Sequence, residues 1–215
     1  VFSIPVPASD LVADSDTLVE GRVTGTGGTA ANAIQDYAVA EGVNPNPGST
    51  TALSINPITG DNLITLAEGG ATSITVTGKV TGKFAAGDVV SLKLHDKTYA
   101  TTVAADGSFS VAVSMADLKA DVDTKIEGTV TGTGGSTATA AQDYQVETDA
   151  TAGKLTALSI DTITADNIIS AAENTGSINV TGKVAGAFAA GDVVTLTING
   201  KPFAGSVNAQ GVFTT

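Results

Sequence analysis

The chain has 215 residues, carries 22 acidic against 10 basic residues for a formal net charge of −12, and contains no cysteine. The missing cysteines exclude disulfides, thiol catalysis and cysteine-ligated zinc or iron–sulfur sites. The acidic balance argues against nucleic-acid binding, which relies on clustered Lys and Arg, and no run approaches the roughly 18 apolar residues of a membrane span. The acidity leaves two interpretations open. Self-repulsion keeps the protein soluble, or the acidic side chains bind a hard cation such as calcium, which prefers oxygen ligands.

Internal repetition sets the organisation of the chain. Residues 53–62 return as residues 158–167 with seven of the ten residues identical, and Thr59, Asp61 and Asn62 are among those retained. Further matches extend the repeat over the rest of the chain: 76–80 with 180–184, 84–90 with 188–194, 20–28 with 127–135, and 35–37 with 142–144. The matches predict that residues 1–42 are the C-terminal part of one repeat, 43–149 a complete repeat, and 150–215 the N-terminal part of the next.

The two partial repeats are cut at the same place. Phe2 and Phe213 are both equivalent to Phe109 of the complete repeat, so head and tail together make about one module. A half-sandwich alone would expose a sheet edge and an apolar face. We therefore expect these halves to pair end to end with complementary halves of other copies, or to belong to a longer chain.

The complete repeat is predicted to consist of strands with one helical turn at residues 115–119. Alternating apolar residues between regularly spaced turn signals give seven strands, at 53–58, 74–80, 90–94, 99–103, 109–113, 126–131 and 138–146. Gly78 interrupts the second alternation and suggests a bulge. The pattern predicts an all-β fold of tandem immunoglobulin-like Greek-key β-sandwich repeats of about 105 residues.

The first candidate metal site lies in the repeated segment. Each copy offers two carboxylates and an amide oxygen: Asp61, Asn62 and Glu68, then Asp166, Asn167 and Glu173. Calcium takes six to eight oxygens, so a neighbouring module must contribute, and the nearest acids across the joint are Glu147 and Asp149, with Glu41 at the earlier joint. The alternative interpretation is an Asx-turn at residues 61–62 with an exposed glutamate.

Two other groups of acids are weaker candidates. Asp143 and Asp36 precede tyrosines on the last strand, whose alternation turns the tyrosine inward and the aspartate outward. The remaining group is Asp117, Asp121 and Asp123, echoed by Asp10, Asp14 and Asp16. It lacks the spacing of an EF-hand loop, and the favoured interpretation is an acid at a helix N-terminus followed by a solvated loop.

The sequence shows no catalytic set. The one histidine, His95, is replaced by Asn199 in the next copy, and no nucleophile, base and orienting group can be assembled. We expect a protein that is not an enzyme.

The order of the motifs resembles a known family. The motifs are 58–62 with Glu68, 76–78, 87–90, Tyr99, 106–109 and 117–118. Together they resemble the bacterial Ig-like repeats that form the extender regions of giant RTX adhesins, the biofilm and ice-binding adhesins of Gram-negative bacteria. The likeness covers essentially the whole chain. One departure is the turn at residues 131–135, where many relatives carry an Asp-Ala-Ala-Gly-Asn-like sequence, so a ligand from that Asp is absent.

The resemblance implies a function and a location. It implies a structural extender that calcium rigidifies at domain junctions, with Asp61, Asn62 and Glu68 among the ligands and neighbouring repeats of the same chain as partners. It also implies type I secretion and display at the bacterial cell surface on an outer-membrane-anchored adhesin, with no membrane insertion by this segment. The alternative is an Ig-like module that itself binds a glycan or surface protein, although three tyrosines and no tryptophan leave few aromatics for such a site.

Overall fold

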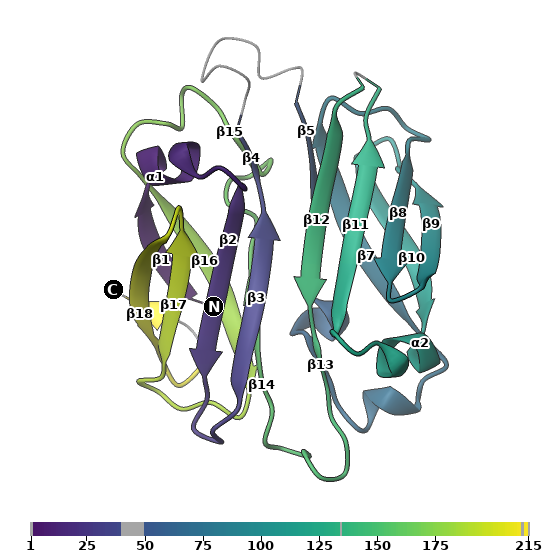
Figure 1. Cartoon of the computed structure of the whole chain (residues 1–215), viewed down its shortest axis with the longest axis vertical. Helices are drawn as coiled ribbons and strands as arrows, with labels where there is room; N and C mark the ends of the chain where they lie inside the picture. Colours follow the sequence, from purple (N-terminus) through teal and green to yellow (C-terminus); the bar gives the residue numbers. More distant parts are fainter. Residues whose placement is uncertain (1, 40–49, 134, 212, 215) are drawn as a thin grey trace.

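The computed structural model describes residues 2–39, 50–133, 135–211 and 213–214, which form two β-sandwiches standing side by side (Figure 1). No helix among these residues has the length and apolarity needed to cross a membrane. The expected all-β, immunoglobulin-like fold is confirmed. The repeat boundary expected near residues 42–43 lies outside the described residues.

The first body, here called the middle sandwich, contains residues 51–146. Its three-stranded sheet has the order β10 (Ser108–Ser114), β7 (Ser73–Gly82), β5 (Thr51–Ile55). Its four-stranded sheet has the order β12 (Thr137–Asp143), β11 (Lys125–Thr131), β8 (Val89–Leu94), β9 (Lys97–Thr102). A short parallel pair joins β13 (Gln145–Val146) to β6 (Leu63–Ile64). The remaining elements are α2 (Met115–Ala120) and the 3₁₀ turns η2 (Ile58–Gly60) and η3 (Glu68–Gly70). The seven predicted strands and the helical turn are all present.

The second body, here called the composite sandwich, is built from both ends of the chain. Its three-stranded sheet has the order β1 (Phe2–Pro7), β16 (Ser177–Gly186), β14 (Thr156–Ile160). Its five-stranded sheet has the order β19 (Phe213–Thr214), β18 (Lys201–Val207), β17 (Val193–Ile198), β2 (Leu18–Thr24), β3 (Ala30–Asp36). The parallel pair here is β15 (Ile168–Ile169) with β4 (Ala38–Val39), and α1 is Ala8–Ala13. Within this single chain, each partial repeat is completed by the other.

Equivalent residues pair in both sandwiches. Phe2 lies opposite Gly182 on β16, just as Phe109 lies opposite Gly78 on β7. The second residue equivalent to Phe109, Phe213, lies on β19, where it pairs with Val207 of β18 in the other sheet. The head and the tail therefore pair in the same strand register as the complete repeat. Phe2 and Phe213 lie in different sheets, so they do not compete for the position equivalent to Phe109.

Small branched residues fill both cores. Along β8 the inward residues Val90, Leu92 and Leu94 are at most 1% exposed, whereas Val89 is 53% exposed. This is the period-2 alternation that the sequence predicted. The composite core is one cluster that includes Val23 from the head and Leu158 from the tail.

The expected bulge at Gly78 is absent, because β7 continues through it with partners on both sides, Ile55 and Phe109. The reason for glycine is a close approach. A Cβ built on Gly78 would lie 2.2 Å from the carbonyl oxygen of Ser54 and 2.4 Å from Cζ of Phe109. The interruption in the apolar pattern marks the place where the Phe109 ring covers the strand.

Replacing Gly78 by Ala is expected to destabilise the middle sandwich by about 2–3 kcal/mol, because both the strand and the Phe109 ring must shift. Chemical denaturation measures the change. Gly70→Ala is the matched control, since a Cβ there meets nothing within 4 Å. Equal stability of the two variants would show that the close approach is not a constraint.

Candidate functional site

The repeated aspartates hold the loop that follows the first strand of each repeat. Oδ1 of Asp61 accepts hydrogen bonds from the backbone N–H of Leu63 (3.0 Å) and from the Thr59 hydroxyl (3.2 Å). Asp166 makes the same two bonds to Ile168 and Thr164, at 3.1 and 3.0 Å. This is the Asx-turn of the alternative interpretation. The other carboxylate oxygen of each aspartate makes no hydrogen bond within the described part of the chain.

The repeated asparagines are buried and committed to the backbone. Asn62 and Asn167 are 1% and 2% exposed and have positive φ angles of 62° and 58°. Their Oδ1 atoms accept from the N–H groups of Ile58 (2.8 Å) and Ile163 (3.0 Å). Their Nδ2 atoms donate to carbonyls of β14 and β3, Leu158 (3.0 Å) and Asp36 (2.7 Å) respectively. The sequence pattern predicts these amides as metal ligands, whereas in the structure both ends of each amide already bind protein groups.

The repeated glutamates cap the next turn. Oε2 of Glu68 accepts from the N–H and hydroxyl of Thr65 at 2.9 and 2.7 Å. Glu173 makes the same pair of bonds to Ser170, also at 2.9 and 2.7 Å. Both glutamates are exposed, so their second oxygens face solvent.

Glu147 connects the middle sandwich to the segment that leaves it. Its Oε2 accepts from the N–H of Leu66 at 3.2 Å, and its Oε1 accepts from the N–H of Gly153 at 2.8 Å. Asp149 lies exposed in the same connecting segment, and Glu41 lies outside the described residues.

The acids at this joint supply suitable oxygens but not a formed metal site. Asp61, Glu68 and Glu147 each bind a backbone N–H between residues 63 and 66, which places them along one short segment. Carboxylate oxygens are the donors that calcium takes. Even so, within the described ranges no three acidic or imidazole side chains gather as a metal-binding group. The donor chemistry fits calcium, and the ligand set itself stays a prediction.

Asp36 and Asp143 lie where the two sandwiches face each other: Asp36 lines a hollow with Lys125 of the middle sandwich, and Asp143 lines one with Arg22 and Asn32 of the composite sandwich. Burial raises the pKa of Asp36 to about 7 and that of Asp143 to about 6. The charge of Asp16 contributes to the rise in the pKa of Asp36 and that of Asp123 to the rise in the pKa of Asp143, whereas Lys125 lowers both pKa values. Lys125 belongs to the middle sandwich and Asp36 to the composite one, so this attraction acts between the two bodies.

Asp121 and Asp14 are not solvated, contrary to the sequence interpretation. The hydroxyl of Tyr144 donates to the carbonyl of Leu118 or to Oδ2 of Asp121, each 2.9 Å away. Tyr37 lies 2.6 Å from the carbonyl of Leu11 and 3.0 Å from Asp14 in the same arrangement. Asp121 and Asp14 are only 4% and 7% exposed. The spacing of 23 residues between each aspartate and its tyrosine was the signal that sequence analysis missed.

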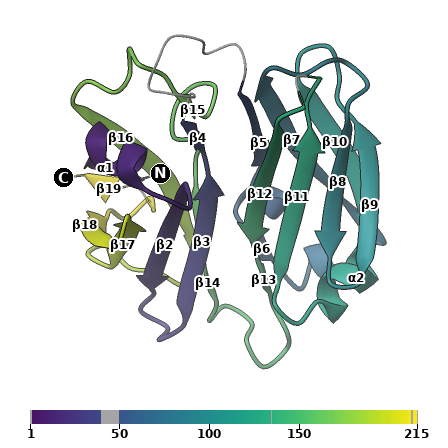
Figure 2. The same cartoon turned by 45° about the horizontal axis from the view of Figure 1, so that its top comes forward.

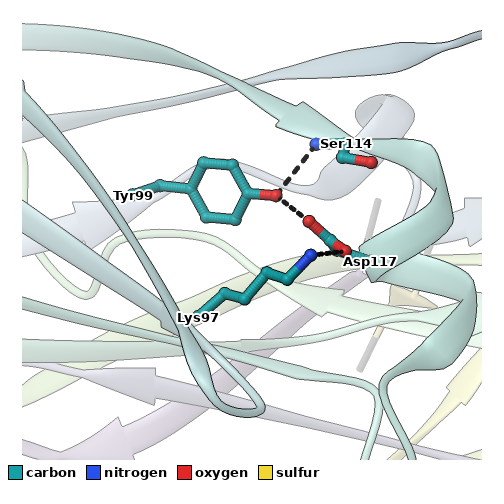
Figure 3. Close-up of polar contacts among 4 residues, drawn as sticks. All are labelled: Lys97, Tyr99, Ser114 and Asp117. Carbon is teal, nitrogen blue, oxygen red and sulfur yellow. Dashed lines mark hydrogen bonds and ion pairs between the residues drawn. The ribbon is translucent and has the colours of Figure 1, made fainter.

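Asp117 confirms the interpretation of an acid at a helix N-terminus and adds a tie between two elements (Figure 3). It accepts hydrogen bonds from Lys97 and Tyr99, both on β9. The N–H of Ser114 also reaches the Tyr99 hydroxyl, at 3.3 Å. These bonds hold the edge strand β9 against α2 and lower the pKa of Asp117.

Fold and joint define a class of protein: paired immunoglobulin-like sandwiches, with oxygen-rich loops where one repeat meets the next. No family model matches the chain, and a search of curated proteins finds no relative. Among solved structures, a bacterial immunoglobulin-like domain from the Marinomonas primoryensis ice-binding adhesin is 36% identical. The match covers 46% of this chain and 98% of that domain, with a TM-score of 0.40. This chain therefore belongs to the bacterial immunoglobulin-like domain family.

Two other solved structures are similar over nearly the whole chain. One, from a study of host cell surface retention of a 1.5-MDa bacterial ice-binding adhesin, is 28% identical; the match covers 98% of this chain and 74% of that one, with a TM-score of 0.42. The other, a Ca²⁺-stabilized adhesin that helps an Antarctic bacterium reach out and bind ice, is 32% identical; the match covers 94% of this chain and 48% of that one, with a TM-score of 0.41. Because these TM-scores are low, the family assignment rests on sequence identity and not on superposition.

Replacing Tyr144 by Phe is expected to destabilise the protein by about 1–3 kcal/mol, because the carbonyl of Leu118 and the carboxylate of Asp121 lose a buried donor. Denaturant unfolding measures this. The control is Tyr99→Phe, since the composite sandwich already has Phe203 at the equivalent position. A Tyr99 variant that is the less stable of the two would contradict the assignment.

Stability is expected to fall as the pH rises from about 4 to about 7. Asp36 has a folded pKa of about 7 against an ordinary value of 3.8, so the folded state binds more protons than the unfolded state in this window. Asp36→Asn and Asp143→Asn should flatten this dependence, measured as denaturation midpoints at about pH 5 and about pH 8. Asp96→Asn, in an exposed turn, should leave it unchanged; an unchanged slope in all three variants would refute the prediction.

Proposed function

We propose that this chain is a structural extender of a bacterial cell-surface adhesin, without enzymatic activity. The observation that carries the proposal is the 36% identity to almost the whole of an adhesin immunoglobulin-like domain. The repetition of that domain along this chain supports it, because tandem arrays of one module are the architecture of extended repeat proteins. The extender projects distal adhesive domains away from the cell.

The location and partners follow from this role. We place the protein outside the cell, on an outer-membrane-anchored adhesin that a type I system exports, where it serves adhesion or biofilm formation. Its partners are the neighbouring repeats of the same polypeptide. The two partial repeats complete each other within this chain, so end-to-end completion by halves of other copies requires the composite sandwich to open.

Calcium is the proposed stiffening agent of the joints. A net charge of −12 makes neighbouring repeats repel one another, and the connecting segment 147–155 adds Glu147 and Asp149. Asp61 and Glu68 each have a carboxylate oxygen beyond the one that binds the loop, and Oε2 of Glu147 reaches the same segment at the N–H of Leu66. A cation held by these three side chains would cancel the repulsion and fix the angle between repeats. One related adhesin is described as Ca²⁺-stabilized.

Removing calcium with a chelator is expected to lower the melting temperature, because a ligand that binds only the folded state stabilises it. Small-angle scattering should also show a more flexible particle. Melting and scattering curves that are identical with calcium and with chelator would refute the calcium proposal.

A matched set of variants locates the site. Glu68→Gln and Glu147→Gln should reduce the calcium-dependent rise in melting temperature. Glu127→Gln removes an exposed glutamate from β11 and should leave the rise intact. If all three variants respond to calcium like the parent, the ions bind elsewhere.

A further inference from the structure

The two sandwiches meet through equivalent residues of the repeat. One set belongs to the middle sandwich and the other to the composite sandwich, and each set is here called a pairing face. The middle pairing face is Ala52, Leu53, Asn62, Leu63 and Gly82, and the composite pairing face is Ala157, Leu158, Asn167, Ile168 and Gly186. Each residue of one face occupies the position of its counterpart in the other repeat.

The apolar contacts between the faces are reciprocal. Leu63 of the middle sandwich packs against Ala157, and its equivalent Ile168 packs against Ala52, the equivalent of Ala157. The buried apolar cluster around Leu63 draws its other members, Ala157, Ala185 and the partly buried Leu155, from the composite sandwich. Leu63 and Ile168 are only 5% and 2% exposed. Without a partner, the pairing face would expose these side chains to water.

Glycines allow the close approach at both ends of the interface. A Cβ on Gly186 would lie 3.2 Å from Cδ2 of Leu63, and a Cβ on Gly82 would lie 2.8 Å from Cδ1 of Ile168. Both glycines also have positive φ angles, 78° and 76°. A Cβ at either position would also meet the backbone of its own sandwich, the carbonyl oxygen of Thr50 at 2.0 Å for Gly82 or that of Leu155 at 2.2 Å for Gly186, so glycine is required on both counts.

The polar contacts repeat the same symmetry. Nδ2 of Asn62 donates to the carbonyl of Leu158 at 3.0 Å, and Nδ2 of Asn167 approaches the carbonyl of Leu53 at 3.5 Å. The neighbouring edge strands β3 and β12 run in opposite directions between the bodies (Figures 1 and 2). A surface that contacts its own equivalent with reciprocal residues is isologous, the type of interface that closes a two-fold dimer.

We propose that the pairing face is a self-association surface, whose partner is the same face of a repeat in a second copy of the chain. Contacts seen here within one chain would then form between two chains with the repeats antiparallel. Strings that project from two opposed surfaces meet in this orientation, so the face would join adhesin chains laterally. The proposal goes beyond the extender role and requires no calcium.

Pairing within one chain and pairing between chains use the same residues and therefore compete. The connecting segment holds the two faces at high local concentration, which favours the contact within the chain. Disabling one face should release the other for a second copy. This competition makes the proposal testable with the whole chain.

The test compares three variants of the 215-residue chain. A composite-face variant carries Ala157→Glu and Ile168→Asp, a middle-face variant carries the equivalent Ala52→Glu and Leu63→Asp, and a third carries all four. Each double variant keeps one intact face, so both should dimerise with rising concentration in analytical ultracentrifugation. The quadruple variant should stay monomeric. If both double variants fold but stay monomeric, the proposal is overturned, as it is if the quadruple variant dimerises equally.

Crosslinking gives a second test that changes each face only mildly. The chain has no native cysteine, so Leu63→Cys with Ala157→Cys should give a crosslink within one chain on treatment with a short bis-maleimide. Ala52→Cys with Leu63→Cys, placed on the composite-face variant, should instead give a covalent dimer, since Leu63 of one copy meets Ala52 of the other. Circular dichroism verifies the fold; a folded variant that yields no covalent dimer would overturn the proposal.

Discussion

The buried side-chain amide in the loop after the first strand of each repeat is the interaction on which the rest of this structure depends. Asn62 and Asn167 take a left-handed backbone conformation, in which an asparagine is far less strained than a branched residue. From there each amide oxygen binds an N–H four residues back, which closes the loop, and each amide nitrogen reaches a carbonyl of another strand. The loop, the short parallel pair and the approach of the second sandwich all follow from one side chain.

This arrangement changes the meaning of the repeated Asp-Asn segment. The pattern could be found in the sequence because both copies keep the same polar residues, but polarity alone does not separate a metal ligand from a side chain that caps a loop. The aspartates cap the loop through one oxygen and leave the other unused, whereas the asparagines use both ends of the amide. Of the two residue types, the aspartates are thus the better placed to receive a cation.

The strands were predictable because each buries one face. Apolar residues therefore recur at every second position, as Val90, Leu92 and Leu94 do. Gly78 was misread because its cause is a ring on the adjacent strand, a contact that no local pattern records. The bonds of Tyr144 and Tyr37 to Asp121 and Asp14 were missed for a similar reason, since 23 residues separate the partners. Equivalence of Phe2, Phe109 and Phe213 showed that the two ends add up to one module, but not that they would close on each other within one chain.

Glu147 gives the joint a property of its own. Its two oxygens bind N–H groups on different segments, one at Leu66 in the middle sandwich and one at Gly153 in the connection. The connection is folded into turns that include the bond between Thr148 and Thr151. When the bond to Gly153 breaks, the residues released from the turns can extend to about 3.3–3.6 Å each. The connection can thus lengthen and let the middle sandwich move away from the composite one while both cores stay intact.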